Sequence, residues 1–186
     1  MYRMSLITMF APPSLSSRIN IPRCMKMALV HDMAEALVGD ITPVDGVTKD
    51  EKSRRESTTI AYFTQSLLGR VNGGMTGQDL QDVWREYEDG ETLESKFVHD
   101  VDKIELVLQM LEYEKAHDGK IDLGEFSWVA SRIELPEVRA WSDEVMRERE
   151  EFWAKTGGHH TTYTPEKIPD MTQIAQHDEY YGNRKV

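Results

Sequence analysis

The sequence predicts an all-α fold, a compact bundle of about six or seven helices. Apolar residues recur every three or four positions in several segments, which is the period of a helix with one buried face. Cap and stop residues frame these segments, with polar or proline residues before them and glycines after them. At 186 residues the chain fits one domain. We therefore expect one domain over residues 1–157 and an irregular tail over 158–186.

The first predicted helix runs from Met1 to Ala11 and stops at Pro12. It opens on apolar residues, with neither a polar cap nor an acidic first turn. We expect that this helix is incomplete at its start. The alternative is a short but complete N-terminal segment.

The next two helices have clear start signals. Asn20 is a suitable cap for a helix that covers residues 23–38. Thr48 and Glu51 have the spacing of a capping box, in which each side chain bonds a free backbone amide of the other residue. A helix is therefore expected over residues 48–68.

The sequence after residue 77 predicts a short acidic helix over 78–87 and two long helices. The first long helix extends from Thr92 to His117, and the second opens at Pro136 and extends to Lys155. An apolar stripe at helical spacing indicates which face of the first is buried. Its members are Phe97, Val101, Ile104, Leu108 and Leu111.

Composition and charge exclude several classes of partner. The chain has 33 acidic and 22 basic residues, a formal net charge of -11, and lacks the basic stripe that binding a nucleic-acid polymer requires. No apolar run approaches the roughly 18 residues of a membrane helix, so we expect no membrane partner. Cys24 is the only cysteine, which favours a reducing compartment. We expect a cytoplasmic protein, with a nuclear location left open.

An adjacent histidine and aspartate interrupt the most apolar predicted helix. His31 and Asp32 lie between Met27 and Glu35, in a stretch that is otherwise largely apolar. Placing an imidazole and a carboxylate in an apolar wall is costly unless something compensates them, and a divalent cation does so. The alternative is a satisfied core histidine beside a surface acid, which is common for an isolated pair.

Two longer blocks extend this pair: HDMAE at 31–35 followed by GDITP at 39–43, and KFVHDVDKIE at 96–105. These blocks resemble the HD-domain phosphohydrolases, and within them the 5′-deoxynucleotidase branch. The resemblance extends over about residues 1–114. One feature departs from it: the family's first metal-ligand histidine, in a pattern resembling His-Met-Tyr-Arg-Met, would fall immediately before Met1. A phosphate-binding arginine further upstream is also expected to precede the first residue.

The resemblance implies a metal site made by His31, Asp32 and Asp102. Asp102 lies within the apolar stripe of its helix, which favours an inward-facing, compensated carboxylate over a surface acid. One imidazole and two carboxylates suit a divalent ion such as Mn, Co, Fe, Zn or Mg, with water completing the coordination. His99 shares a face with Asp102 but is expected to be a partly exposed helix residue.

Three further residues are expected to act on the substrate. By resemblance, Glu35 positions or deprotonates the attacking water, and its alternative is a surface ion pair. Asp40 is expected to be catalytic and to bind substrate by orienting the nucleotide or the leaving 5′-oxygen; its alternative is a plain turn aspartate. Lys103 is expected to bind the substrate phosphate, and pairing with Glu105 is its alternative.

The resemblance therefore implies a metal-dependent phosphomonoesterase that converts deoxyribonucleoside 5′-monophosphates to deoxynucleoside and phosphate, weakened by loss of the first histidine ligand. One alternative is an HD hydrolase of other nucleotides. Another is a non-catalytic nucleotide-sensing or interaction protein that retains the fold. The sequence leaves the oligomeric state open, with a homodimer as one alternative.

Overall fold

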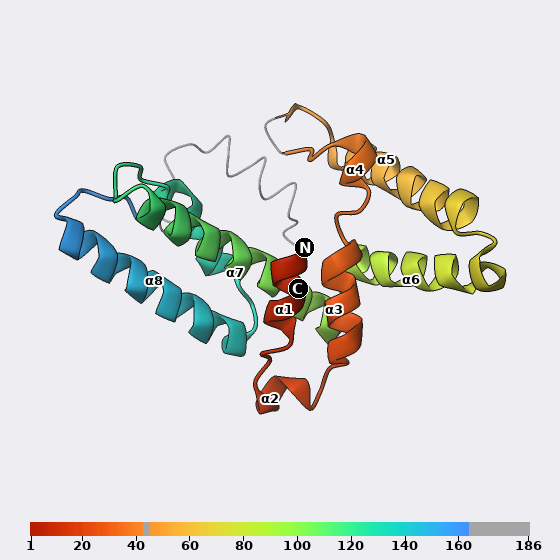
Figure 1. The fold of residues 1–186 in the computed structure, drawn as a ribbon, viewed down its shortest axis with the longest axis horizontal. Helices are drawn as coiled ribbons and strands as arrows, with labels where there is room; N and C mark the ends of the chain where they lie inside the picture. The colour runs from red at the N-terminus through yellow and green to blue at the C-terminus, as the bar shows by residue number, and fades with distance from the viewer. Residues whose placement is uncertain (43–44, 164–186) are drawn as a thin grey trace. The chain divides into compact units, whose positions relative to one another are not determined.

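The computed structural model describes residues 1–42 and 45–163, and every regular element in those ranges is helical (Figure 1). The prediction of an all-α fold is confirmed. The α-helices are α1 (Tyr2–Thr8), α2 (Pro13–Ser16), α3 (Ile21–Val30), α4 (Glu35–Val38), α5 (Lys49–Ala61), α6 (Met75–Asp89), α7 (Leu93–Ala116) and α8 (Pro136–Thr156). A wider π-helical turn, η2 (Tyr62–Leu67), and two 3₁₀ segments, η3 (Val71–Gly74) and η4 (Gly124–Arg132), complete the set.

Contacts divide the described chain into two compact units. The first unit contains Met1–Leu29 together with residues 86–163, and the second contains Val30–Arg85. The single domain expected over 1–157 stays a prediction. Of the tail expected at 158–186, residues 164–186 lie outside the described residues.

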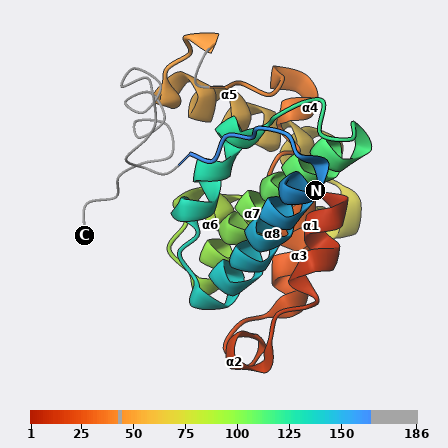
Figure 2. The ribbon, with the colours of Figure 1, turned by 90° about the vertical axis from the view of Figure 1, so that its left-hand side faces the viewer.

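Helix α7 is the central element of the first unit. It packs against α8, η4 and α1, and α7 and α8 lie side by side in both views (Figure 1 and Figure 2). Phe97, Val101 and Ile104 are buried, as the apolar stripe predicts. The Thr92 side chain caps the helix by accepting a hydrogen bond from the Ser95 amide at 3.1 Å.

A buried ion pair joins α7 to α8. Arg149 of α8 and Glu114 of α7 form two hydrogen bonds of 2.8 and 2.9 Å, and both side chains are 0% exposed. The Trp153 indole donates to the same carboxylate at 2.9 Å, and the Leu123 amide donates to its other oxygen at 2.9 Å. Every oxygen of the buried carboxylate therefore has a donor, which is the condition for burying a charge.

Backbone amides of the chain after α8 donate hydrogen bonds to side chains in and just before η4. The Thr161 amide donates to Asp122 at 2.7 Å, and the Tyr163 amide donates to Ser127 at 2.8 Å. Gly124 permits this close approach, since a Cβ at that position would lie 1.7 Å from the Thr161 carbonyl oxygen.

The second unit is organised around a small apolar cluster. Ala34, Ile60 and Trp84 are buried in it, with Met33 and Phe63 packed against them. This cluster fixes the segment 31–38 against α5, and α4 and α5 are neighbours in the structure. The cluster therefore supports the stretch that contains the predicted site.

Helix α5 begins as expected and ends earlier than expected. The Thr48 side chain accepts a hydrogen bond from the Glu51 amide at 3.3 Å, which confirms the predicted cap. After Ala61 the chain continues as the wider turn η2. The Thr64 hydroxyl donates to the Ile60 carbonyl at 2.8 Å. It thereby competes for a carbonyl that the regular helix would use.

The helix expected over residues 23–38 is not continuous, so this prediction was wrong. Helix α3 ends at Val30 and α4 begins at Glu35. Between them the Met33 amide bonds the Val30 carbonyl at 3.1 Å and the Glu35 amide bonds the Asp32 carbonyl at 3.0 Å. These are bonds to the third residue back, so the turn is tighter than an α-helix. The break lies at the His31–Asp32 pair, and Glu35 follows it as the first residue of α4.

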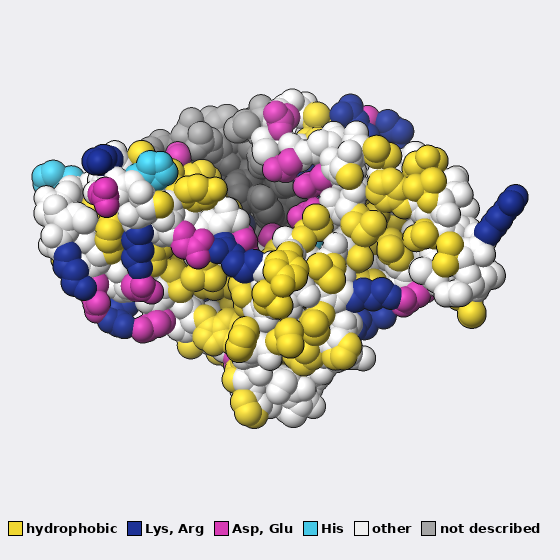
Figure 3. Space-filling model, in the orientation of Figure 1, with side chains coloured by type: hydrophobic (Ala, Val, Ile, Leu, Met, Phe, Trp, Pro, Cys, Tyr) yellow, Lys and Arg dark blue, Asp and Glu magenta, His cyan; other side chains and the backbone are white. Residues whose placement is uncertain are grey.

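The outward face of α1 is apolar. Figure 3 shows hydrophobic side chains gathered over the N-terminal helices. Tyr2, Leu6, Met9 and Phe10 are all exposed, although Met4 on the opposite face is buried. A group of exposed large apolar side chains on one helix is typical of an interaction surface.

Among residues 1–42 and 45–163, no helix is both long enough and apolar enough to cross a membrane.

Candidate metal-binding and catalytic site

The side chains of His31 and Asp32 lie close together, and that of Asp32 is partly open to solvent. Nε2 of His31 lies 2.9 Å from Oδ2 of Asp32, and the two side chains are 1% and 40% exposed. The tight turn after α3 brings these neighbouring side chains together, although adjacent residues on a regular helix point about 100° apart. The His31 nitrogen and the Asp32 oxygen therefore lie close together, and a solute can reach them from the exposed side of Asp32. This donor set fits a first-row divalent ion.

Glu35 has an unusually high pKa. Burial, the largest cause, together with the negative charges of Asp32 and Asp40, raises the pKa of its carboxyl to about 7. Burial is also the main cause that raises the pKa of Glu56 on α5. The second unit therefore gathers carboxylates in a poorly solvated place, which is typical of functional sites rather than of a solvated surface.

Asp40 follows the end of α4 in a short, ordered turn. Gly39 has φ +79°, a conformation that a residue with a Cβ rarely adopts, and Asp40 is exposed. Two residues later, the Thr42 amide and hydroxyl both donate to Asp45 at 2.7 Å. Hydrogen bonds therefore hold the backbone on the C-terminal side of Asp40.

Lys52 of α5 joins this turn to the helix. Its ammonium group donates to the Ile41 carbonyl at 3.1 Å and lies 3.6 Å from Glu56. Sequence reasoning did not single out Lys52 or Glu56. A signal was present, because Lys52, Glu56 and Ile60 recur at four-residue spacing and so place two charged residues on the buried face of α5.

Asp102 and Lys103 lie on α7, in the first unit. Asp102 is half-buried. Lys103 donates to Asp100 at 3.0 Å, so its partner is Asp100 rather than the Glu105 expected as its alternative. Asp100 is itself buried and accepts the Leu135 amide at 2.7 Å. The predicted role of Lys103 in binding phosphate stays a prediction.

His99 has the structural role that the sequence favoured. Its Nε2 lies 3.0 Å from the Tyr87 carbonyl oxygen, and its ring stacks on Tyr87 with centroids 4.0 Å apart. A ring held in this way stabilises the junction of α6 and α7.

The predicted metal ligands come from both units. Within the described residues of either unit, no three His, Cys, Asp or Glu side chains lie close enough together to hold a metal ion. His31 and Asp32 belong to the second unit and Asp102 to the first. The pair of donors is therefore seen in the structure, and the complete ligand set stays a prediction.

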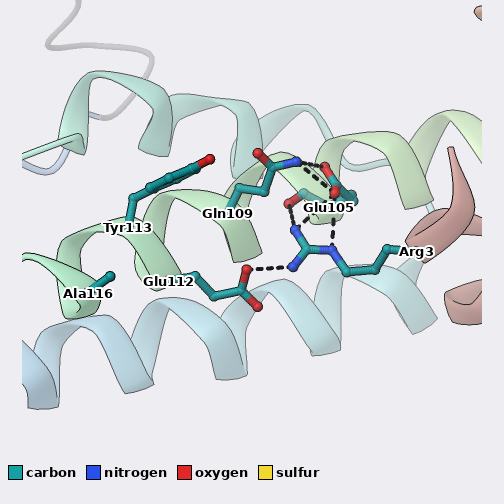
Figure 4. A pocket seen from close by; sticks show the side chains of 6 residues that line it. All are labelled: Arg3, Glu105, Gln109, Glu112, Tyr113 and Ala116. Carbon is teal, nitrogen blue, oxygen red and sulfur yellow. Dashed lines mark hydrogen bonds and ion pairs between the residues drawn. The ribbon is translucent and has the colours of Figure 1, made fainter.

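A shallow hollow on the first unit has none of the predicted site residues in its lining. Figure 4 shows Arg3 reaching toward two acidic residues of α7. Its guanidinium donates to Glu105 at 3.0 Å and to Glu112 at 2.5 Å. Gln109, Tyr113 and Ala116 complete the lining. Because carboxylates already hold the only arginine of this hollow, it offers no free cation to a phosphate.

Known proteins match the segments that contain the predicted site residues. The family model described as "HD domain" matches residues 1–140. The 5′-deoxynucleotidase hdd1 of Schizosaccharomyces pombe is 45% identical over 83% of this chain and 76% of its own length. The 5′-deoxynucleotidase YBR242W of Saccharomyces cerevisiae is 40% identical over 83% of this chain, which spans only 63% of that relative.

A solved structure supports the fold as well as the sequence match. The HD domain-containing protein YGK1 superposes with a TM-score of 0.68 at 33% identity, covering 82% of this chain and 76% of that one. Both predicted blocks, 31–43 and 96–105, lie within the matched family model. The helical fold, the His31–Asp32 pair and these matches together show that the chain belongs to the HD-domain family.

Proposed function

We propose that this protein is a metal-dependent 5′-deoxynucleotidase, which hydrolyses deoxyribonucleoside 5′-monophosphates to deoxynucleoside and phosphate. The observation that carries the proposal is the buried His31 imidazole at 2.9 Å from the half-exposed Asp32 carboxylate, one turn before Glu35. Relatives that match this segment are named 5′-deoxynucleotidases. The donor chemistry and the names of the relatives thus support one reaction class.

His31, Asp32 and Asp102 are the proposed ligands of a divalent ion. When bound, such an ion supplies a Lewis acid for a phosphoryl oxygen and lowers the pKa of water. Nitrogen and oxygen donors suit Mn, Co, Fe or Zn, and Mg is a further alternative. The acidic balance of the chain makes a local cation necessary for a phosphorylated substrate.

Glu35 is the proposed general base. The attacking water gives its proton to the Glu35 carboxylate as its oxygen forms a bond to phosphorus. The bond between phosphorus and the 5′-oxygen breaks, and that oxygen takes up a proton from solvent water to leave as the nucleoside hydroxyl. A base is most effective when its pKa lies near the operating pH, and burial gives Glu35 that property. Asp40 orients the nucleotide or the leaving oxygen.

Phosphate release from deoxynucleoside monophosphates tests the function. The purified chain, loaded with Mn²⁺ or Co²⁺, is expected to release phosphate from deoxyadenosine 5′-monophosphate, and Asp32→Ala is expected to lose both the metal and the activity. Deoxynucleoside triphosphates form the comparison arm. Turnover of triphosphates alone would favour an HD hydrolase of other nucleotides. Nucleotide binding without turnover by the metal-loaded chain would favour a sensing protein.

A homodimer is the proposed assembly. The exposed apolar residues in and just after α1, namely Tyr2, Leu6, Met9 and Phe10, support it. Light scattering measures the mass in solution. A monomer at all concentrations would contradict this assembly without affecting the proposed reaction.

A further inference from the structure

Lys52 is held in a place where lysine is uncommon. Its side chain is only 18% exposed, although it lies on α5, a helix whose neighbouring residues Arg54 and Arg55 are exposed. Lysine side chains are mostly exposed, and they are almost never fully buried unless they are paired. Its hydrogen bond leaves the helix and ends on the carbonyl of Ile41, 3.1 Å away, which is the residue immediately after Asp40.

The charge of Lys52 opposes a group of carboxylates. Burial first, then the charges of Asp32, Asp40 and Glu56, raise the pKa of Glu35, and Lys52 is the cation that lowers it. Lys52 also lies 3.6 Å from Glu56, whose side chain is 11% exposed. Like charges in a poorly solvated place repel one another strongly, so removing the cation would push the carboxylates of the group apart. Asp40 is exposed and lies on the turn that Lys52 helps to hold through the Ile41 carbonyl, so this repulsion would act on that turn.

We propose that Lys52 is a positioning residue for the reaction: its ammonium group holds the Ile41 carbonyl, fixes the turn over 39–42, and offsets the carboxylates around Glu35. The inference rests on the proposed deoxynucleotidase function and adds a residue to it. Lys52 acts through the backbone and the charges of Asp40 and Glu35, without touching the substrate. Losses at such supporting positions are commonly about 10–100-fold in activity.

The simpler interpretation is an ordinary ion pair along one helix. Lys52 and Glu56 are four residues apart, and exposed pairs of that spacing contribute little. Arg55 provides the matched control on the same helix. It forms an ion pair of 2.7 Å with Glu51, also four residues away, and both side chains are more exposed, at 43% and 33%. Its bond stays within α5, whereas that of Lys52 crosses to the turn.

Three variants of the metal-loaded protein separate the interpretations. With deoxyadenosine 5′-monophosphate as substrate, Lys52→Met is expected to lower kcat by about 10–100-fold with little change in KM. Lys52→Arg is expected to recover most of the loss, because a guanidinium keeps the charge and the donor. Arg55→Met is expected to match the parent. Equal kcat for Lys52→Met and Arg55→Met would overturn the proposal.

Hydrogen exchange gives a second measurement that does not depend on activity. The Thr42 amide, bonded to Asp45, reports on the order of the turn. Faster exchange over 39–42 is expected in Lys52→Met and not in Arg55→Met. Unchanged exchange in Lys52→Met would overturn the anchoring role even if kcat fell. If Lys52→Met does not fold, Lys52→Gln replaces it, since an amide retains a donor without the charge.

The two experiments also separate this inference from the proposed function. A parent chain without phosphatase activity would contradict the deoxynucleotidase function. In that case the exchange comparison still decides whether Lys52 holds the turn. Loss of kcat together with faster exchange in Lys52→Met, and neither change in Arg55→Met, would support both.

Discussion

Glu35 is the residue whose removal tests the chemistry most directly. Glu35→Gln keeps the size and hydrogen-bonding capacity of the side chain but removes the base. We expect the variant to keep its fold and bound metal, and to lose about 10²–10⁴-fold in kcat, the usual contribution of a general base. Steady-state kinetics and metal analysis on the same preparation measure both properties.

An exposed glutamate supplies the control for this substitution. Glu91→Gln, in the turn before α7, is expected to leave kcat unchanged. Unaltered turnover in Glu35→Gln would reduce Glu35 to a buried structural acid. Loss of the metal in Glu35→Gln would instead make it a ligand, which contradicts the assignment as base.

Four of the six predicted site residues lie in one contiguous stretch. His31, Asp32, Glu35 and Asp40 are close along the chain, so local spacing and family resemblance were enough to select them. The partners of Lys103 and Lys52 could not be predicted. Each depends on where a second segment packs, and a sequence pattern cannot show that Lys52 reaches the Ile41 carbonyl.

At the scale of elements, the pairing of α7 with α8 depends on Arg149. Arg149→Met would leave Glu114 charged, buried and without its main partner. Breaking a buried ion pair from one side costs about 3–5 kcal/mol. We expect that loss in the free energy of unfolding, measured by urea denaturation followed by circular dichroism.

Arg147 on the same helix is the matched control. It pairs with Glu144 and Glu151 on the exposed face of α8, where ion pairs contribute little. Arg147→Met is therefore expected to unfold close to the parent. If both variants lost the same stability, the loss would come from helix α8 itself rather than from the buried pair.

Most helix boundaries could be predicted because their signals are local. Thr48, Thr92 and Pro136 all act at helix starts as expected. The break at residues 31–34 could not be predicted, since the pattern of apolar residues continues through it. The turn is stabilised by packing of Met33 and Ala34 against α5 and Trp84, which are distant in sequence. Tertiary contacts thus override the local helical preference at the site.

At the scale of the whole molecule, the charge of the chain is unevenly distributed. All 33 acidic residues follow position 31, and the first 31 residues carry only basic charges. The carboxylates of the second unit add to a strongly negative field. A phosphate monoester would be repelled by this field without a bound cation, so metal and substrate binding are expected to be linked.

Metal binding should also stabilise the folded protein, because the proposed ligand Asp102 is distant along the chain from the adjacent ligands His31 and Asp32, and an unfolded chain cannot hold the three together. A ligand that binds only the folded state at about 100 times its Kd adds about 2.7 kcal/mol to the free energy of unfolding. For a chain of this length that corresponds to a rise in Tm of roughly 5–10 °C. Thermal unfolding with Mn²⁺ and after chelation measures the difference. The rise is expected to disappear in Asp32→Ala and to persist in Asp50→Ala, an exposed aspartate in the first turn of α5. A rise of the same size in Asp32→Ala would mean that the ion is held by other residues.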